Sequence, residues 1–249
     1  MTLPSTTSSR TDLAGKRILL TGGTTGIGRA TLHALAASGA RILTFGRHQA
    51  ALDEALAGVD GDVGGLAVDA ATADGIDRVF AALDERLGGI DMLVACAALG
   101  AQPVHEMADQ DWRYVIDTNL TGYLACARAA ILRMARQGGG HLLFVGSIST
   151  EIKAAGESVY AATKAGIQAF AETLRKEVAD KGIRVSVIQP GSIDTDMQEC
   201  SDEEKRAAVA AGRMLPPEEV AEAILFVLTR SATCDIVNLR IEPLIQKTG

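Results

Sequence analysis

The residues with the clearest chemical potential are Tyr160 and Lys164, which stand four positions apart in a helix-periodic stretch. At this spacing two side chains project from one face of a helix. A tyrosine hydroxyl has a pKa of about 10 in water, so it needs a nearby positive charge to exchange protons near neutral pH. We interpret Tyr160 as a candidate general acid and base, with Lys164 supplying the charge and also able to bond a cofactor ribose. An isolated Tyr/Lys pair at this spacing usually lies on the protein surface and has no catalytic role. Whether this pair is catalytic therefore depends on the residues around it.

Two further polar residues support this interpretation. Ser147 ends the apolar run His141–Ser147, which we predict to be a strand. Ligands bind at the carboxyl ends of strands in open α/β sheets, so the Ser147 hydroxyl could hold a substrate carbonyl. Asn119 lies within Asp111–Met134, among apolar residues at helical spacing. A buried amide without partners costs roughly 1–3 kcal/mol, so we expect Asn119 either to bond the backbone or to serve the function.

A nucleotide site is indicated by Arg17–Ser38, where a short apolar run meets a glycine-rich turn and then a helical pattern. The glycines follow a GxxxGxG spacing at Gly22, Gly26 and Gly28. Glycines let a ligand approach the backbone, and the N-terminus of the following helix attracts phosphate. No lysine follows Gly28, which disfavours an ATPase loop. The alternative is a tight strand-to-helix turn that binds nothing.

The second predicted strand, Arg41–Gly46, ends where a dinucleotide fold meets the adenosine ribose. A carboxylate there would bond the ribose 2′-hydroxyl, whereas an arginine would pair with a 2′-phosphate. Arg47 follows this strand, and no Asp or Glu occurs from 42 to 51, which favours NADP(H) over a merely solvated loop arginine. Asp69 closes the third predicted strand, Gly65–Asp69, where it could accept the adenine amino group or cap the next helix.

Short apolar runs alternate with helical patterns along the chain, which predicts an α/β fold with a doubly wound, mostly parallel sheet of the Rossmann type. The remaining predicted strands are Ile18–Leu20, Met92–Ala95 and Arg184–Gln189, and the predicted helices are the stretch after Gly28, Ala50–Ala57, Ile76–Leu87, Asp111–Met134, Ser158–Val178 and a last helix from Pro217. We expect residues 1–12 to be a disordered tail and 13–249 to be a single domain. The polar stretch 192–215 lacks a core stripe, which predicts a mobile lid over the site.

Composition limits the classes of partner. The 249 residues are 47% hydrophobic and 22% charged, which suits one large core. The net charge of −7 argues against nucleic acid or an anionic membrane as the main partner. No run has the ~20 apolar residues of a membrane span or the apolar core of a signal peptide, so we expect a cytoplasmic protein. The four cysteines and four histidines are scattered without metal-ligand spacing, and we expect no metal.

Five motifs, TGGTTGIG, DTNLTG, GSIST, YAATK and PGSIDT, occur in the order and spacing of the short-chain dehydrogenase/reductase family, and the resemblance spans nearly the whole chain. It implies that Tyr160 is the proton donor or acceptor and that Lys164 tunes it and binds the nicotinamide ribose. It also implies that Ser147 orients the substrate oxygen and that Asn119 steadies Lys164 through water. The implied cofactor contacts are Gly22, Thr24, Gly26, Ile27, Gly28, Arg47, Asp69, Ala97, Tyr160, Lys164, Pro190, Gly191 and Thr195. A homo-oligomer, a tetramer or dimer built through the long helices, is implied as well.

Two stretches depart from the family pattern. Ala95–Ala98, with the sequence Ala-Cys-Ala-Ala, stands where the family usually has Asn-Asn-Ala-Gly. The small side chains keep room for adenosine, but the links that the asparagine side chains make between strands are lost. The C-terminal stretch DIVNLRIEPLIQKTG lacks the Asp-Gly-Gly ending common in acyl-carrier-protein reductases. It looks more like members that act on small hydroxy acids or on general aldehydes and ketones.

The leading hypothesis is an NADP(H)-dependent oxidoreductase that transfers hydride between the nicotinamide and a small carbonyl or secondary alcohol substrate. One alternative is a 3-oxoacyl thioester reductase, in which Arg128, Arg133 and Arg136 dock an acidic carrier, although a solvated helix face is the stronger interpretation of these arginines. The other alternative is a sensor or scaffold that binds NADP without turnover. The intact set of Asn119, Ser147, Tyr160 and Lys164 counts against a sensor, which needs none of the chemistry.

Overall fold

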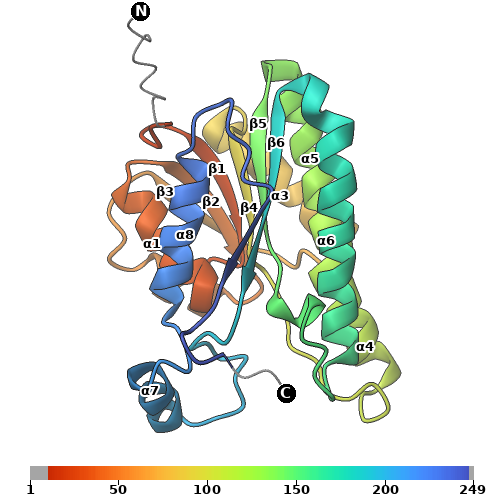
Figure 1. Ribbon diagram of the computed structural model, residues 1–249. Helices are drawn as coiled ribbons and strands as arrows, with labels where there is room; N and C mark the ends of the chain where they lie inside the picture. The colour runs from red at the N-terminus through yellow and green to blue at the C-terminus, as the bar shows by residue number, and fades with distance from the viewer. Residues whose placement is uncertain (1–10, 247–249) are drawn as a thin grey trace, which may run out of the picture.

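The computed structural model describes residues 11–246, which form one parallel sheet covered by helices on both faces (Figure 1). Seven strands within this range pair in the order β3-β2-β1-β4-β5-β6-β7, and every pairing is parallel. The strands are β1 Arg17–Thr21, β2 Arg41–Gly46, β3 Val63–Ala67, β4 Met92–Ala95, β5 Gly140–Val145, β6 Ile183–Pro190 and β7 Asn238–Ile241. The order reverses between β1 and β4, so the loops after these two strands diverge and leave a crevice. The predicted doubly wound α/β fold is confirmed.

The helices divide between the two faces of the sheet. One face carries α1 Gly26–Ala37, α2 Gln49–Leu56 and α8 Pro217–Leu228, and the other carries α3 Ala73–Leu87, α5 Gly122–Gln137 and α6 Ser158–Val178. Figure 1 shows α1 and α8 side by side on one side of the sheet and α5 with α6 on the other. The short helices α4 Asp109–Ile116 and α7 Asp202–Ala210 lie beyond the carboxyl ends of the strands, at the bottom of that view.

Each central strand contributes to both cores. Leu19 of β1 packs in the cluster under α3, α5 and α6, whereas its neighbours Ile18 and Leu20 pack under α1 and α8. All three side chains are fully buried. A strand that is covered on both faces has a continuous run of apolar residues, and this run is why β1 could be predicted from the sequence.

Three predicted elements have the expected bounds, whereas two predicted strands differ by two residues: β3, and β5, which ends at Val145 rather than at the predicted Ser147. β2, β4 and α6 begin and end where predicted. The prediction for β3 was wrong by two residues, because Gly64 and Gly65 conceal its pattern: a Cβ on Gly65 would lie 2.7 Å from the Leu56 side chain of α2. No strand was predicted after residue 189, yet β7 pairs with β6. β7 has only four residues and alternates exposed with half-buried side chains at the sheet edge, so its apolar signal is weak.

The predicted single helix Asp111–Met134 is interrupted. A π-helical turn, Asp117–Thr121, separates α4 from α5 and holds Asn119, which is fully buried. Turns of this kind insert an extra residue per turn and occur frequently at functional sites. Hydrophobic periodicity does not reveal such an insertion, because the apolar residues on both sides still fall at near-helical spacing.

Two segments were expected to be loosely attached, the N-terminal tail and the lid. The structure describes the whole of the lid but only the end of the tail. Residues 1–10, most of the expected tail, lie outside the described residues, while Thr11 donates hydrogen bonds to the carbonyls of Thr229 (2.9 Å) and Arg230 (2.8 Å). The expected lid, 192–215, contains α7 and is joined at its base by a bridge between Ile193 and Leu215. Its movement stays a prediction. None of the helices within residues 11–246 has the length and apolar character needed to cross a bilayer.

A buried histidine makes the stability of this sheet sensitive to acid. His141 of β5 lies with Nε2 2.8 Å from Oγ of Ser186 in β6, and its Nδ1 has no partner among the described residues. Burial, helped by the charge of Arg184, lowers the pKa of His141 to about 3. The folded protein therefore keeps the ring neutral at pH values where the unfolded chain protonates it. This contribution to stability is complete above about pH 6.5 and is lost as the pH falls toward 3.

We expect the free energy of unfolding to fall by about 2 kcal/mol between pH 7.5 and pH 5 because of His141 alone. His141→Gln has no proton to gain in this range and keeps a hydrogen-bonding group for Ser186, so it should lose most of that pH dependence. Urea unfolding of both proteins at the two pH values measures the difference. Equal pH dependence in the two proteins would contradict the assignment.

Candidate active site

A cavity of about 340 Å³ opens at the carboxyl ends of the strands, where the strand order reverses. It is lined by the loops after β1, β2, β3, β4, β5 and β6 and by the start of the expected lid. The predicted site residues that line it are Gly22, Thr24, Gly26, Ile27, Gly28, Arg47, Asp69, Ala97, Ser147, Tyr160, Lys164, Pro190, Gly191 and Thr195. Asn119 does not line it, but its neighbour Thr118 does. The sequence also gave no reason to single out Thr118, His48 or Met197, which line the same cavity.

The glycine-rich turn is closed so tightly that side chains do not fit. A Cβ on Gly22 would lie 2.6 Å from Cα of Ala97, and one on Gly28 would lie 2.0 Å from the carbonyl oxygen of Gly22. Thr25, the residue before α1, makes no side-chain cap, so the first amides of this helix are left for another acceptor. A phosphate group is the ligand that such a helix N-terminus binds best.

One buried polar atom in this cavity also calls for a ligand. Oγ1 of Thr118 is buried and has no hydrogen-bond partner among residues 11–246. Buried polar groups are nearly always paired in folded proteins, so this unpaired hydroxyl, carried by a residue that lines the cavity, is consistent with a polar ligand or water beside it. Together with the glycine turn and the uncapped helix, this hydroxyl fits a nucleotide cofactor.

Ser147 and Tyr160, the two residues predicted to meet the substrate oxygen, both line the cavity. Ser147 lies two residues beyond β5, where its hydroxyl accepts a hydrogen bond from the Ser149 amide (3.1 Å) and lies 2.5 Å from Oγ of Ser149. Burial raises the pKa of Tyr160 to about 12, while a hydrogen bond with Ser147 opposes this rise and the charge of Glu157 adds to it. Without a ligand, the phenol therefore carries its proton at neutral pH.

Lys164 is buried to 1% exposure beside this phenol. Its ammonium donates a hydrogen bond to the carbonyl of Val145 at the end of β5 (2.8 Å) and lies 5.6 Å from the ring centre of Tyr160 and 5.3 Å from that of Tyr123. Burial lowers the pKa of Lys164 to about 8. The ammonium is therefore mostly charged at neutral pH and can give up its proton more readily than an exposed lysine.

Asn119 bonds the backbone, which is one of its two expected roles. Its Nδ2 donates to the carbonyl of Leu99 (2.8 Å), and its Oδ1 accepts from the amide of Leu99 (2.8 Å). Nδ2 also lies 3.4 Å from Oγ1 of Thr163 in α6. The side chain therefore fixes the loop after β4 against the π-helical turn. Its implied link to Lys164 through water stays a prediction.

The Ala95–Ala98 stretch is tied to β1 by a hydroxyl that sequence reasoning missed. Oγ1 of Thr21, the last residue of β1, accepts hydrogen bonds from the amides of Cys96 and Ala97, both at 3.0 Å. This one acceptor joins the ends of β1 and β4 where no asparagine is available to do so. Burial raises the pKa of the Cys96 thiol to about 12, so this thiol is protonated and unreactive.

The far end of the cavity holds Arg47 and Asp69. The Arg47 guanidinium donates to the hydroxyl of Tyr114 (3.1 Å), and this hydroxyl donates to Oδ2 of Asp69 (2.7 Å). The residue that caps α3 is Thr72, whose Oγ1 accepts from the Gly75 amide (3.0 Å). Of the two roles considered for Asp69, capping is thus filled by Thr72, and the Asp69 carboxylate lies at the cavity wall.

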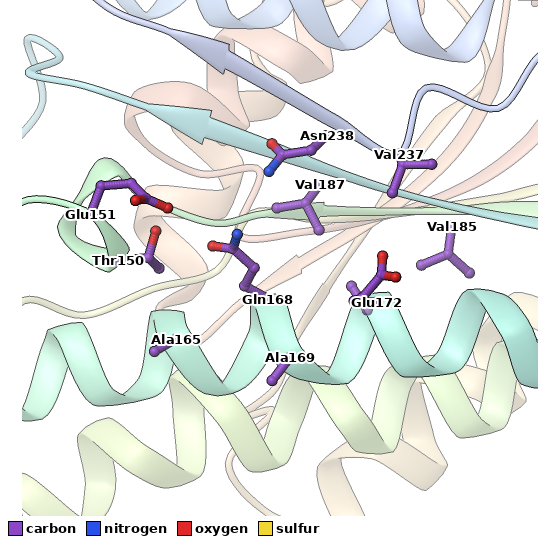
Figure 2. Close-up of a pocket in the computed structure, with 11 residues that line it drawn as sticks. Thr150, Glu151, Ala165, Gln168, Ala169, Glu172, Val185, Val187, Val237 and Asn238 are labelled. Carbon is purple, nitrogen blue, oxygen red and sulfur yellow. The ribbon is translucent and has the colours of Figure 1, made fainter.

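A second cavity, of about 400 Å³, lies between α6 and the strands β6 and β7 (Figure 2). Ala165 and Val187 are typical of its apolar walls, and of its two carboxylates, Glu151 and Glu172, the second forms ion pairs with Arg175 and Lys176. It contains none of the predicted catalytic or cofactor residues, so we assign the chemistry to the first cavity. Across residues 11–246 no three His, Cys, Asp or Glu side chains gather to hold a metal ion.

Comparison with known proteins identifies the family to which the chain belongs. The sequence model of the short chain dehydrogenase family matches residues 16–206. The 3-oxoacyl-[acyl-carrier-protein] reductase FabG of Vibrio harveyi is 34% identical over 229 residues, which cover 89% of this chain and 93% of that protein.

Solved structures extend the likeness to the whole fold. L-sorbose reductase from Gluconobacter frateurii, complexed with NADPH and L-sorbose, superposes with a TM-score of 0.83 at 28% identity, covering 93% of this chain and 97% of the other. A short-chain type dehydrogenase/reductase from Mycobacterium marinum gives a TM-score of 0.80 at 30% identity, covering 93% and 95%. With the family match extending over most of the sequence and the fold shared over 93% of the chain, this chain belongs to the short-chain dehydrogenase/reductase family of oxidoreductases.

Proposed function

We propose that the protein is an NADP(H)-dependent oxidoreductase that interconverts a small carbonyl compound and the corresponding secondary alcohol, with Tyr160 as general acid and base. The observation that carries this proposal is the meeting of Ser147, Tyr160 and Lys164 in the cavity that also contains the glycine turn. When bound, the cofactor supplies or accepts the hydride.

In the reducing direction, Ser147 donates a hydrogen bond to the substrate oxygen and holds it beside the phenol. Ser149 fixes the Ser147 hydroxyl through the 2.5 Å contact between the two oxygens. Tyr160, protonated because burial raises its pKa to about 12, passes its proton to this oxygen as negative charge develops there. The Lys164 ammonium then stabilises the phenolate left behind. The oxidising direction reverses these steps.

The preference for NADP(H) is supported by the end of β2. A Cβ on Gly46 would lie 2.6 Å from Cγ2 of Thr24, so no carboxylate side chain fits at the strand end. Arg47 follows, lines the cavity and has no carboxylate within ion-pair distance among residues 11–246. Its charge is therefore free to pair with a 2′-phosphate.

A second candidate, reduction of a 3-oxoacyl thioester on a carrier protein, is favoured by the FabG relatives at about a third identity. Of the three arginines considered for the carrier, Arg133 already forms two hydrogen bonds with the Asp84 carboxylate and lies over the Phe80 ring. Arg128 and Arg136 are exposed on α5, which leaves them to meet an acidic partner. A sensor without turnover has no comparable observation in its favour.

Tyr160→Phe should abolish turnover and spare cofactor binding. It removes one hydroxyl while the ring and the glycine turn remain, and general acid assistance contributes roughly 10²–10⁴-fold. Turnover is measured by NADPH oxidation on whichever ketone, keto acid, aldehyde or acyl thioester a screen identifies, and binding by NADPH fluorescence. Near-normal turnover in this variant would remove Tyr160 from the mechanism.

Arg47→Asp should erase or reverse the cofactor preference. An arginine–phosphate bond contributes roughly 1.5–3 kcal/mol, so we expect NADPH to bind about ten- to a hundredfold more weakly in the variant and NADH to bind about as before. Arg78→Asp, which changes the same charge at an exposed position on α3 away from the cavity, is the matched control. The assignment of Arg47 fails if the unmodified protein binds NADH as tightly as NADPH.

If an acidic carrier protein docks on α5, changing an arginine there should affect KM for the carrier-bound substrate but not KM for a small thioester without a carrier. Arg128→Glu should raise KM for a carrier-bound 3-oxoacyl thioester about tenfold, because like charges then face each other across the contact. The same variant should use the N-acetylcysteamine thioester normally, and Arg78→Glu should leave both substrates unaffected. Unchanged kinetics of Arg128→Glu with the carrier would rule out this docking surface.

A further inference from the structure

Tyr114 connects the two charged side chains at the far end of the cavity. It lies on α4, between the loops that follow β2 and β3. Its hydroxyl accepts from Nη1 of Arg47 (3.1 Å) and donates to Oδ2 of Asp69 (2.7 Å), and its ring centre lies 5.5 Å from Cζ of Arg47. Arg47 and Asp69 line the cavity, whereas Tyr114 does not. Any effect of Tyr114 on a ligand therefore passes through these two residues.

The direction of the two hydrogen bonds is fixed by the chemistry of the groups. A guanidinium has only donors and a carboxylate only acceptors, so the phenol must accept from Arg47 and give its single proton to Asp69. The other carboxylate oxygen of Asp69 accepts from the amide of Ala71 (2.9 Å). Each oxygen of Asp69 thus accepts one hydrogen bond, and Asp69 forms no direct ion pair with Arg47.

This arrangement matters because Arg47 is otherwise free to move. Its side chain is exposed, and among residues 11–246 its guanidinium donates a hydrogen bond to the Tyr114 hydroxyl. A long flexible side chain loses rotamer freedom when it binds a ligand, and a group that holds it beforehand reduces that loss. Without the phenol proton, Asp69 would attract the guanidinium into a direct ion pair, which would neutralise the charge that a 2′-phosphate would otherwise meet.

We propose that Tyr114 is a positioning residue for cofactor selection, which holds Arg47 toward a 2′-phosphate and keeps Asp69 from neutralising it. The inference rests on the proposed NADP(H) function and extends it to an element, α4, that follows β4 rather than β2. It assigns the preference for NADP(H) to Arg47, Asp69 and Tyr114, of which Tyr114 does not line the cavity.

Tyr114→Phe keeps the ring and removes the hydroxyl. We expect NADPH to bind about three- to tenfold more weakly and NADH to change less than about twofold. This is the size of effect expected for the loss of one ordinary hydrogen bond, and it is smaller than for Arg47→Asp because Arg47 itself remains. The ratio of the two affinities isolates Arg47, because both cofactors share the adenine that Asp69 would meet. The kcat at saturating NADPH should not change, since Ser147, Tyr160 and Lys164 lie at the other end of the cavity.

A double-mutant cycle separates positioning from a general structural effect. In an Arg47→Ala background, Tyr114→Phe should leave the affinity ratio unchanged, because the residue through which it acts is gone. Arg113→Ala, which removes a cation from the same helix and a bond to Asp109, is the matched control and should leave the ratio as it is. Fluorescence titration with NADPH and NADH measures all five proteins.

The possible results distinguish this inference from the function on which it rests. If the unmodified protein does not prefer NADPH, both are overturned. If it prefers NADPH and Tyr114→Phe retains the full preference, the role of Tyr114 is overturned while the proposed function stands. An equal change of the ratio in the presence and absence of Arg47 also overturns it, because Tyr114 would then act by another route.

Discussion

The hydrogen bond from Lys164 to the Val145 carbonyl is the interaction on which the reactive end of the site depends. Burying an ammonium costs several kcal/mol unless good partners replace water. Here the partner is a backbone carbonyl at the end of β5, so the bond holds α6 against that strand. Tyr160 lies one turn earlier on α6, and Ser147 lies two residues beyond β5. A single contact between helix and strand therefore sets the distance between the proposed acid and the residue proposed to hold its substrate.

The nucleotide end depends on close backbone approach rather than on a buried charge. Gly22 and Gly28 allow the first turn to close against Ala97 and against itself, and Thr21 joins β1 to β4 through two amide hydrogen bonds. The family resemblance led us to expect a loss of inter-strand links at Ala95–Ala98. A hydroxyl from the neighbouring strand supplies such a link, so the small side chains keep the cavity open while the strand ends stay joined.

Selection between cofactors, as we propose it, uses elements that are distant in the chain. Arg47 and Tyr114 are 67 positions apart, and Tyr114 and Asp69 are 45 apart. They meet because parallel strands all deliver their following loops to one edge of the sheet, and because α4 crosses beyond that edge. In this fold, a residue on α4 can therefore alter the proposed cofactor preference without moving Ser147, Tyr160 or Lys164.

The sequence by itself determined the features that have a local signature. Continuous apolar runs identified β2 and β4, helical spacing identified α6, and the motifs around Gly22 and Tyr160 identified the family. The tertiary structure alone decided the position of β3, the presence of β7, the π-helical turn at Asn119 and the partners of Thr21 and Tyr114. Glycines and a half-exposed edge carry little apolar pattern, and a hydrogen bond between residues distant in sequence leaves no periodic trace. Such contacts exist only once the sheet has brought the strand ends together.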